Sequence, residues 1–465
     1  MTGKGNRCPR WIGVAWTLTA IGGCGDGSRP AMLAESLPDA AGMHRPIILV
    51  TIDTLRADHL GTYGYSRDTS PNLDALASRA VVFERAYSTA GTTLPAHVSL
   101  FSSLYPLQTG VVKNGASVAP SSERTAGLLQ EELKALGYET AGFVSATPVK
   151  AKSGLAAGMD VWAEPGRGEP SRRASETTDR ALAWLETRDT EAFFLWVHYF
   201  DPHQPYEPPS EYADLFAADD ILVEFQRDRG LSADEATTLA PVNSAYDGEI
   251  RFVDAQFARL LAALHDADWY DEATIVVTAD HGEGLGQHDR LGHGRVYGET
   301  LRVPLIIKFP GQFELHGTRR TEPVSLVDIV PTLVETLGLD VTEEFVAQFE
   351  GTNVFRSSSR NRSLYAQRTF RSRPAAWGPG KKFVLLEGRW KLHDSTEAAD
   401  ELYDLRRDPH ELENVIEQNP DVRDRMQQRL ARTLRRFSGA QRRLSNGEEI
   451  PDEILQELRA LGYIR

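Results

Sequence analysis

The chain has 465 residues, of which 41% are hydrophobic and 25% are charged, and its formal net charge is −15 at pH 7. Because a single hydrophobic core stops growing at roughly 250–300 residues, this length predicts one large domain with a smaller appendage. The negative charge, with no basic stripe of interleaved aromatic residues to offset it, argues against a nucleic-acid partner. The composition is that of an ordinary globular protein.

The N-terminal segment has the features of a signal peptide. Three basic residues precede an apolar run over residues 11–21, which is too short to span a bilayer. The run leads to Cys24 in a segment that resembles a bacterial lipoprotein cleavage box, and ordinary signal cleavage nearby is the alternative. We predict a signal peptide over 1–23, a tether over 24–44, and export to the periplasm or outer surface, with membrane contact only through a lipid on Cys24. The processed chain can form no intramolecular disulfide, because the other cysteine is Cys8.

Three short apolar runs, over residues 47–52, 193–197 and 274–278, are typical of strands buried on both faces of a parallel sheet. Polar side chains that can bind a metal follow each run. Because open α/β sheets gather their ligands at the carboxyl ends of the strands, we expect these side chains to meet at one edge. They are Asp53 after the first run, His198, Asp201 and His203 after the second, and Asp280 and His281 after the third.

Helical segments fill the spaces between these strands. Ser70-Pro71 predicts a helix start, with Ser as the cap and Pro in the first turn. Residues 126–136 predict a helix closed by Gly137, and residues 138–145 predict another strand. This alternation predicts the α/β class. Residues 204–245, rich in Pro at first and then acidic and helical, predict an excursion over the site.

The sequence pattern changes near residue 345. Residues 383–386 and 389–392 flank a Glu-Gly pair and predict a hairpin, whereas residues 411–465 are strongly charged and mostly helical. We therefore predict a catalytic domain over 45–345 and a smaller C-terminal α+β subdomain with a helical tail over 346–465.

Thr93 lies where a helix is predicted to begin. Pro95 fits the first turn of that helix, so Thr93 is at or just before its amino end. Free backbone N–H groups and the helix dipole favour an anion there, so a tetrahedral ester could bind against Thr93, with His97 one turn into the helix. The alternative is that Thr93 is only a helix cap.

Three residues together predict a metal site, although each of them alone is weak evidence for one. Asp53, Asp280 and His281 offer carboxylate and imidazole ligands, a set that suits a divalent cation. Thr93 would add an oxygen ligand and act as the nucleophile. An Asp at the end of a strand often only caps a helix, so the prediction depends on the combination.

Several short sequence motifs are informative because of the order in which they occur along the chain. Each one alone is a modest match. They are residues 51–61 (TIDTLRADHLG), 70–77 (SPNLDALA), 201–206 (DPHQPY), 280–283 (DHGE) and 301–307 (LRVPLII), then 390–392 (WKL), 401–405 (ELYDL) and 408–409 (DP).

In this order the segments resemble the sulfatase family of the alkaline phosphatase superfamily, over nearly all of residues 46–465. The resemblance implies a mainly parallel central sheet sandwiched by helices, as in alkaline phosphatase. It also implies a bound divalent metal, Ca²⁺ in family sulfatases, and hydrolysis of a small anionic ester or a sulfated glycan. The His of residues 201–206, which is His203, is expected to contact the ester.

The nucleophile motif departs from the family pattern. Family sulfatases carry a Cys or Ser that becomes formylglycine, followed by a Pro and an Arg, whereas this chain has Thr93, Pro95 and His97. Thr cannot be converted to formylglycine, so either Thr93 attacks with its own hydroxyl or the site works differently.

Other departures replace oxygen ligands and Lys with imidazole. The second of two adjacent family Asp residues is Thr54, a later Asn is His281, and a Lys near the ester is His293. These changes favour Zn²⁺ or Mn²⁺ over Ca²⁺. The resulting set resembles one zinc site of the phosphodiesterase and phosphoethanolamine-transferase branches, which use Thr as nucleophile: Asp53, Thr93, Asp280 and His281.

Three functions remain open on the sequence alone. By family the protein is a sulfuric ester hydrolase. A phosphodiesterase or phosphoryl transferase is the alternative, because water can resolve a phosphorylated Thr whereas a sulfated Thr resists that step. An inactive glycan-binding lipoprotein is the third. The predicted catalytic residues are Thr93, His97, His203 and His293.

Further candidates surround this set. Asp201, His203 and His293 could hold a second metal, or could hydrogen-bond to the ester directly. Lys113 and Asn114 could hold ester oxygens, or could be exposed loop residues. Asp247 and Asp254 lie seven apart on one predicted helix face and form a solvated or packing face.

Overall fold

The computed structural model describes residues 45–356, 362–368 and 380–439, and residues 444 and 456 singly. The predicted signal peptide, tether and Cys24 lie outside the described residues. Among the helices of the described part of the chain, none is long and apolar enough to cross a membrane.

A central sheet forms the core, and within the described residues it has eight strands in the order β12-β2-β11-β7-β1-β6-β4-β5. Strands β7, β1, β6, β4 and β5 are parallel neighbours, and β11 runs antiparallel to β7 and β2. Every residue of β1 and β6 is buried, as their apolar sequences predict. The strands are β1 (Ile47–Ile52), β2 (Val81–Phe83), β4 (Glu139–Val144), β5 (Val161–Ala163), β6 (Phe193–Tyr199), β7 (Thr274–Thr278), β11 (Leu305–Lys308) and β12 (Arg319–Arg320).

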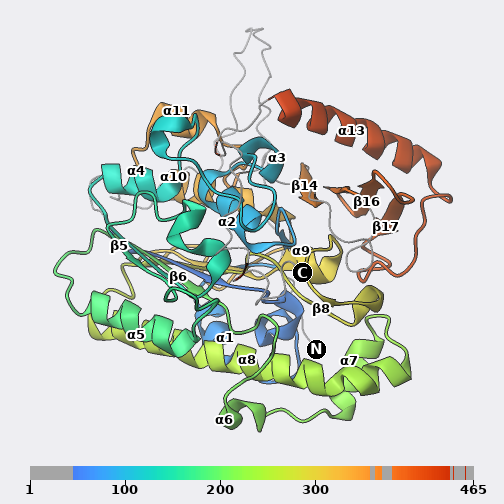
Figure 1. Cartoon of the computed structure of the whole chain (residues 1–465), viewed down its shortest axis with the longest axis horizontal. Coiled ribbons are helices and arrows are strands. Elements are labelled where there is room, and N and C mark those ends of the chain that lie inside the picture. The colour runs from blue at the N-terminus through green and yellow to red at the C-terminus, as the bar shows by residue number, and fades with distance from the viewer. Residues whose placement is uncertain (1–44, 357–361, 369–379, 440–443, 445–455, 457–465) are drawn as a thin grey trace, which may run out of the picture. The chain divides into compact units, whose positions relative to one another are not determined.

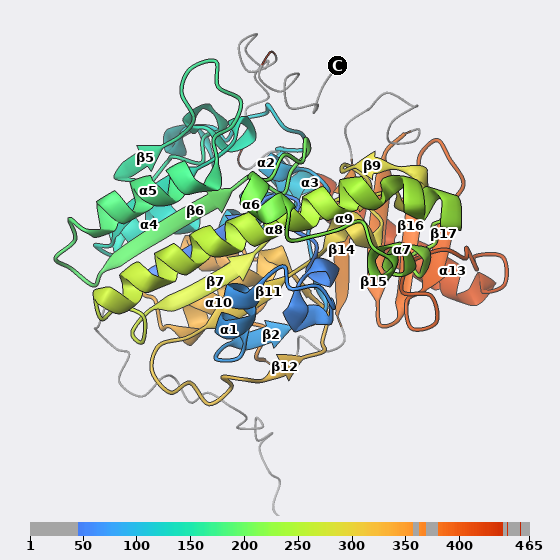
Figure 2. The ribbon, with the colours of Figure 1, turned by 90° about the horizontal axis from the view of Figure 1, so that it is seen from below.

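Helices cover both faces of this sheet, so the predicted α/β class with a mainly parallel sheet is confirmed (Figure 1). Helices α1, α5 and α8 pack together on one face, and α2, α4 and α10 lie on the other. In Figure 2 the long helix α8 crosses in front of the strands of the sheet. These helices are α1 (Pro71–Ala77), α2 (Thr93–Ser102), α4 (Leu129–Ala135), α5 (Ala174–Leu185), α8 (Ala233–Asp266) and α10 (Ile329–Thr336).

Several local predictions are confirmed. Helix α1 begins at Pro71, helix α4 lies inside the predicted segment 126–136, and Gly137 follows it with a left-handed φ of 89° that favours glycine. The predicted excursion over 204–245 contains α6, α7 and the first turns of α8, whose N-terminus is capped by Ser232. The shorter helices are α3 (Pro106–Thr109), α6 (Ser210–Ala213), α7 (Asp220–Arg227), α9 (Gly298–Leu301) and α11 (Glu343–Ala347).

A second, antiparallel sheet follows in the order β14-β15-β16-β17, with helix α13 (Pro420–Gly439) packed on β15 and β16. The predicted hairpin is therefore confirmed as β15 and β16, and the C-terminal α+β class holds. The boundary between residues 345 and 346 stays a prediction, and much of the predicted tail beyond 439 lies outside the described residues. The strands are β14 (Ser363–Arg368), β15 (Lys382–Glu387), β16 (Trp390–Ser395) and β17 (Glu401–Asp404).

Hydrogen bonds connect this subdomain to the loop over residues 286–297, next to a buried ion pair. Lys391 is fully buried, and its Nζ lies 2.7 Å from Oε1 of Glu411. His288 Nε2 lies 3.0 Å from the backbone oxygen of Glu411, and the Tyr297 hydroxyl donates to Glu401 at 2.8 Å. Two small sheets complete the surroundings of this loop: β8 (Gly284–Leu285) with β9 (Leu291–Gly292), and β3 (Ala86–Tyr87) between β10 (Arg302–Val303) and β13 (Val324–Ser325).

Candidate active site

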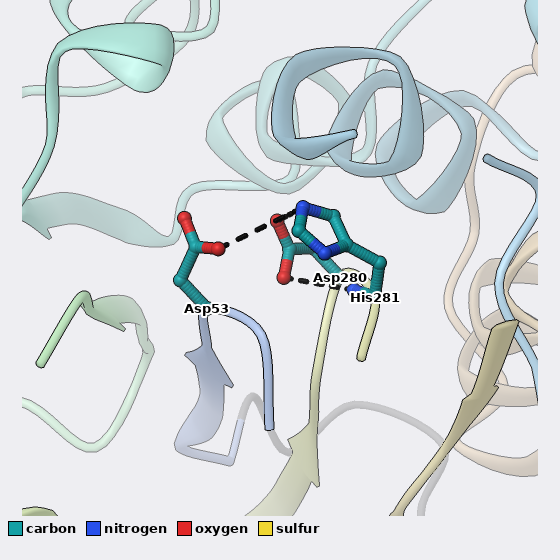
Figure 3. A group of neighbouring side chains, drawn as sticks. All are labelled: Asp53, Asp280 and His281. Atoms are coloured by element: carbon teal, nitrogen blue, oxygen red, sulfur yellow. Dashed lines mark hydrogen bonds and ion pairs between the residues drawn. The ribbon is translucent and has the colours of Figure 1, made fainter. Parts of the chain in front are cut away.

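Asp53, Asp280 and His281 meet at the carboxyl ends of two neighbouring strands. Asp53 directly follows β1, and Asp280 and His281 follow β7, which pairs with β1 in parallel. Their side chains face one another in Figure 3, and one ligand atom of each lies within 4.8 Å of the others. All three are fully buried. Parallel pairing thus brings the three predicted metal ligands together.

Thr93 completes this group from the opposite side. It is the first residue of α2, and its Oγ1 lies 3.4 Å from Oδ2 of Asp53 and 3.4 Å from Nε2 of His281. Thr92 before it is extended, with φ −149° and ψ 144°, so the chain enters the helix at the site. The amino end of α2 adds partial positive charge, which favours a bound anion beside Thr93.

The two carboxylates have no cation among the described residues to offset their charge. Burial, and then the charge of Asp53, raises the pKa of Asp280 to about 7. Burial also raises the pKa of Asp53 well above its usual value and lowers that of His281 to about 4. Asp53 Oδ1 and Asp280 Oδ2 are buried, and neither has a hydrogen-bond partner within the described ranges. Two buried carboxylates with unsatisfied oxygens, a neutral imidazole and a hydroxyl form a donor set that fits a divalent cation.

His203 and His293 lie beside this group and face each other. Their Nε2 atoms are 3.1 Å apart, and the His293 ring stacks on His281 with centroids 4.4 Å apart. His203 Nδ1 lies 2.6 Å from the Gln204 carbonyl oxygen, and His293 Nδ1 lies 3.1 Å from that of Gly91. A carbonyl only accepts, so each Nδ1 carries the proton. The two Nε2 lone pairs therefore converge.

The position of His293 depends on a close approach of two backbone segments. Gly91 lies so near the loop of His293 that a Cβ at residue 91 would come within 2.4 Å of the Arg295 backbone oxygen. Only glycine fits this contact without displacing the loop. Gly91 therefore helps to bring His293, from a distant part of the sequence, to the side of Thr93.

Asp201 does not join His203 and His293, which corrects the expected second metal set. Its carboxylate accepts a hydrogen bond of 2.8 Å from the Ala174 backbone N–H, at the amino end of α5. Arg173 also donates to it at 3.3 Å. Free N–H groups at a helix start attract carboxylates, and here α5 provides them beside the end of β6.

His97 contacts Thr93 and β1 inside the protein, and its expected catalytic role stays a prediction. The ring is fully buried. Nδ1 lies 2.9 Å from the backbone oxygen of Thr93, and Nε2 lies 3.0 Å from Oγ1 of Thr51 on β1. Both ring nitrogens are therefore used within the protein.

Lys113 and Asn114 differ sharply in their surroundings. Lys113 is exposed, whereas Asn114 is only 8% exposed. Asn114 Oδ1 accepts a hydrogen bond of 2.8 Å from the Leu94 N–H, in the first turn of α2. Its Nδ2 is buried and has no hydrogen-bond partner among the described residues, so it offers a donor next to Thr93.

Asp247 and Asp254 belong to the packing alternative, because both are fully buried. Asp247 accepts from the Tyr65 hydroxyl at 2.7 Å and from Arg67 at 2.5 Å. Asp254 accepts from the Leu73 N–H at 2.8 Å, in the first turn of α1. Both Asp residues belong to α8, so their hydrogen bonds hold residues 65–73 against this helix.

His198 was expected among the metal-competent side chains of the second run but was not assigned a role in the predicted site, and the structure places it beside Asp53. Its Nε2 lies 3.6 Å from Oδ2 of Asp53, and its Nδ1 accepts from the Ser145 N–H at 3.4 Å. Burial lowers its pKa to about 4. The available signal was its alternation with Trp196 along β6, which puts both side chains on the face of the sheet that carries Asp53.

The sulfatase family model matches residues 45–339, and the model of the N-sulphoglucosamine sulphohydrolase C-terminal region matches residues 286–437. The first match covers more than half of the chain. The protein therefore belongs to the sulfatase family and is an ester-bond hydrolase.

Two curated relatives illustrate the breadth of this similarity. A multifunctional alkaline phosphatase superfamily protein of Trinickia caryophylli is 25% identical over 384 residues, covering 63% of this chain and 73% of its own. An arylsulfatase of Clostridium perfringens is 23% identical over 441 residues, covering 80% and 90%. The superfamily resemblance read from the motif order is thereby confirmed.

Solved structures share the fold. The phosphonate monoester hydrolase of Agrobacterium radiobacter has a TM-score of 0.68 at 22% identity, covering 85% of this chain and 96% of its own. Another structure, in complex with its substrate D-glucosamine-2-N,6-O-disulfate, has a TM-score of 0.67 at 18% identity, covering 85% and 99%. At such identities these likenesses establish the architecture.

Proposed function

We propose that the protein hydrolyses an anionic phosphoric ester with Thr93 as the attacking group, at a divalent cation held by Asp53, Thr93, Asp280 and His281. The observation that carries this proposal is the position of Thr93 Oγ1, 3.4 Å from both Asp53 and His281 at the start of α2. A residue that only capped α2 would not need two metal-competent neighbours. In the proposed site the hydroxyl is both ligand and nucleophile.

The donor set favours Zn²⁺ or Mn²⁺ over the Ca²⁺ of family sulfatases, because it includes the neutral imidazole of His281. Such a cation, when bound, stabilises the deprotonated Thr93 oxygen and offsets the charge that develops on the ester. The unsatisfied oxygens of Asp53 and Asp280 support this occupancy.

The remaining groups come from the chain itself. Thr93 Oγ1 forms a bond to phosphorus while the bond from phosphorus to the leaving oxygen breaks, and that oxygen takes a proton. Water then attacks phosphorus and breaks its bond to Thr93, which regains its hydroxyl. The amino end of α2 and Nδ2 of Asn114 provide donors for the ester oxygens.

Phosphate is favoured over sulfate by the chemistry of Thr. A phosphorylated Thr93 can be hydrolysed by water, whereas a sulfated Thr has no route comparable to the geminal diol of formylglycine, which eliminates sulfate. The similarity to a phosphonate monoester hydrolase supports a phosphorus centre. The sulfuric ester is the second candidate, supported by the arylsulfatase relative and by the neighbour whose substrate is a sulfated sugar.

We further propose that His203 and His293 hold a second divalent cation. The Nε2 atoms of His203 and His293 are 3.1 Å apart, close enough for both to bind one cation. Histidine ligands usually donate their other ring N–H to a carbonyl or carboxylate, as both do here. The second cation would stabilise the leaving oxygen.

Export belongs to the proposal as well. The basic residues before the apolar run at 11–21, and Cys24 after it, support a signal peptide and a lipid anchor.

Parallel assays test the reaction class. Purified enzyme loaded with Zn²⁺, Mn²⁺ or Ca²⁺ would be given p-nitrophenyl sulfate, p-nitrophenyl phosphate and bis-p-nitrophenyl phosphate. We expect turnover of a phosphoric ester with Zn²⁺ or Mn²⁺, and none in Thr93→Ala. Turnover of the sulfate alone would overturn the phosphoric ester assignment, and unchanged activity of Thr93→Ala would remove Thr93 as nucleophile.

A further inference from the structure

A chain of hydrogen bonds runs from the central sheet to the nucleophile. The indole N–H of Trp196 on β6 donates to Thr51 Oγ1 at 2.9 Å. Thr51 Oγ1 on β1 lies 3.0 Å from His97 Nε2, and His97 Nδ1 lies 2.9 Å from the backbone oxygen of Thr93. All four residues are fully buried.

The chemistry of the two ends fixes the direction of this chain. An indole N–H can only donate, and a carbonyl oxygen can only accept. For a neutral imidazole, each of the three contacts receives one proton only if Thr51 donates its hydroxyl to Nε2 and His97 carries its proton on Nδ1. The other tautomer would point a nitrogen lone pair at the Thr93 carbonyl.

The chain also connects the nucleophile to a metal ligand. Thr51 lies near the end of β1 and Asp53 directly follows that strand, two residues along the chain. Asp53 Oδ2 lies 3.4 Å from Thr93 Oγ1. One strand therefore anchors Thr93 twice, through Asp53 at its side chain and through Thr51 and His97 at its carbonyl.

We infer that His97, held in a single tautomer by Thr51 and Trp196, is a positioning residue that fixes Thr93 for attack. The inference rests on the proposed role of Thr93 as nucleophile. A family Arg at residue 97 could not perform this function, because a guanidinium has no acceptor for the Thr51 hydroxyl. Misplacement of a reacting group by ~1 Å can cost on the order of 10²-fold in rate. Loss of these hydrogen bonds should therefore lower kcat without removing a metal ligand or a substrate contact.

Thr51→Val tests this inference in the metal-loaded enzyme. Valine has nearly the same shape but gives Nε2 of His97 no donor. With bis-p-nitrophenyl phosphate as probe, we expect kcat to fall roughly tenfold or more, with KM and bound metal unchanged. Thr51→Ser should recover most of kcat. Thr274→Val is the matched control, because Thr274 on β7 has a buried hydroxyl with no hydrogen-bond partner in the described structure.

The tautomer itself can be read by ¹⁵N NMR of the histidine rings. The His97 signal is assigned by its loss in His97→Gln. We expect the Nδ1–H form in the wild type and a changed or mixed form in Thr51→Val. If Thr51→Val does not fold, Trp196→Phe replaces it, because this change removes the indole donor to Thr51. We then expect a smaller fall in kcat and a smaller change in the His97 tautomer.

The two measurements separate failure of the inference from failure of the proposed function. An Nε2–H tautomer in the wild type, or full kcat in Thr51→Val, would overturn the positioning role of His97. If the wild type turned over no phosphoric ester, the proposed function would fail, and the positioning role in phosphoryl transfer would fail with it. The NMR spectrum would then still decide whether the hydrogen-bond chain exists.

Discussion

Replacing Asp280 with Asn should remove a pH dependence from the stability of the metal-free protein. Burial, and then the charge of Asp53, raises the pKa of Asp280 from 3.8 to about 7. A carboxyl whose pKa is higher in the folded state than in the unfolded state opposes folding when it ionises. Its penalty is absent below the unfolded pKa, grows as pH rises, and is complete above about pH 7.

The size of the effect follows from the shift. Each pKa unit corresponds to about 1.4 kcal/mol, so the full penalty is on the order of 4 kcal/mol, with roughly 2.5 kcal/mol gained between about pH 5 and pH 8. The buried histidines act in the opposite sense. The pKa of His97, like that of His281, is lowered to about 4 by burial, so they cost stability as pH falls below about 6.5. The difference between Asp280→Asn and the wild type isolates the carboxyl.

Urea unfolding in the presence of a chelator, at several pH values across this range, measures that difference. We expect Asp280→Asn to gain stability over the wild type steadily as pH rises. Saturating Zn²⁺ should abolish the gain, because the cation offsets the carboxylate charge only in the wild type. A difference that stayed constant with pH would refute the reasoning that Asp280 is a buried carboxyl awaiting a cation.

Three further predictions concern other parts of the structure. Metal analysis should find two divalent cations per wild-type chain and one in His203→Ala or His293→Ala; one in the wild type would contradict the second site. Glu411→Gln should reduce the free energy of unfolding by about 3 kcal/mol, because it leaves the buried Lys391 unpaired, and an unchanged urea midpoint would argue against the pair. Asn114→Ala should cost about 1 kcal/mol of stability, through the lost cap on α2, and should also raise KM for the ester; a normal KM would deny its contact with substrate.

The fold could be predicted from the sequence because buried parallel strands appear as short, continuous apolar runs. The apolar runs at 47–52, 193–197 and 274–278 became β1, β6 and β7, since strands covered on both faces need apolar residues at every position. Their ends share one edge, so Asp53 and Asp280 meet as expected.

The sequence could not show which element packs beside each side chain of the site. Asp201 follows β6 as expected, but the amino end of α5 captures its carboxylate. His97 is in α2 as expected, but its ring bonds to Thr51 and to the first residue of its own helix. His198 was named as metal-competent but given no role in the site, because a histidine inside an apolar strand resembles a packed residue. Such contacts depend on tertiary packing, which spacing in one sequence does not encode.

Trapping the covalent intermediate tests the central claim most directly. The metal-loaded enzyme would be mixed with bis-p-nitrophenyl phosphate, quenched in acid within its first turnovers, and digested for tandem mass spectrometry. We predict a phosphoryl-ester adduct on Thr93 that is absent from Thr93→Ala. Turnover with no adduct on Thr93, together with full activity of Thr93→Ala, would contradict the account.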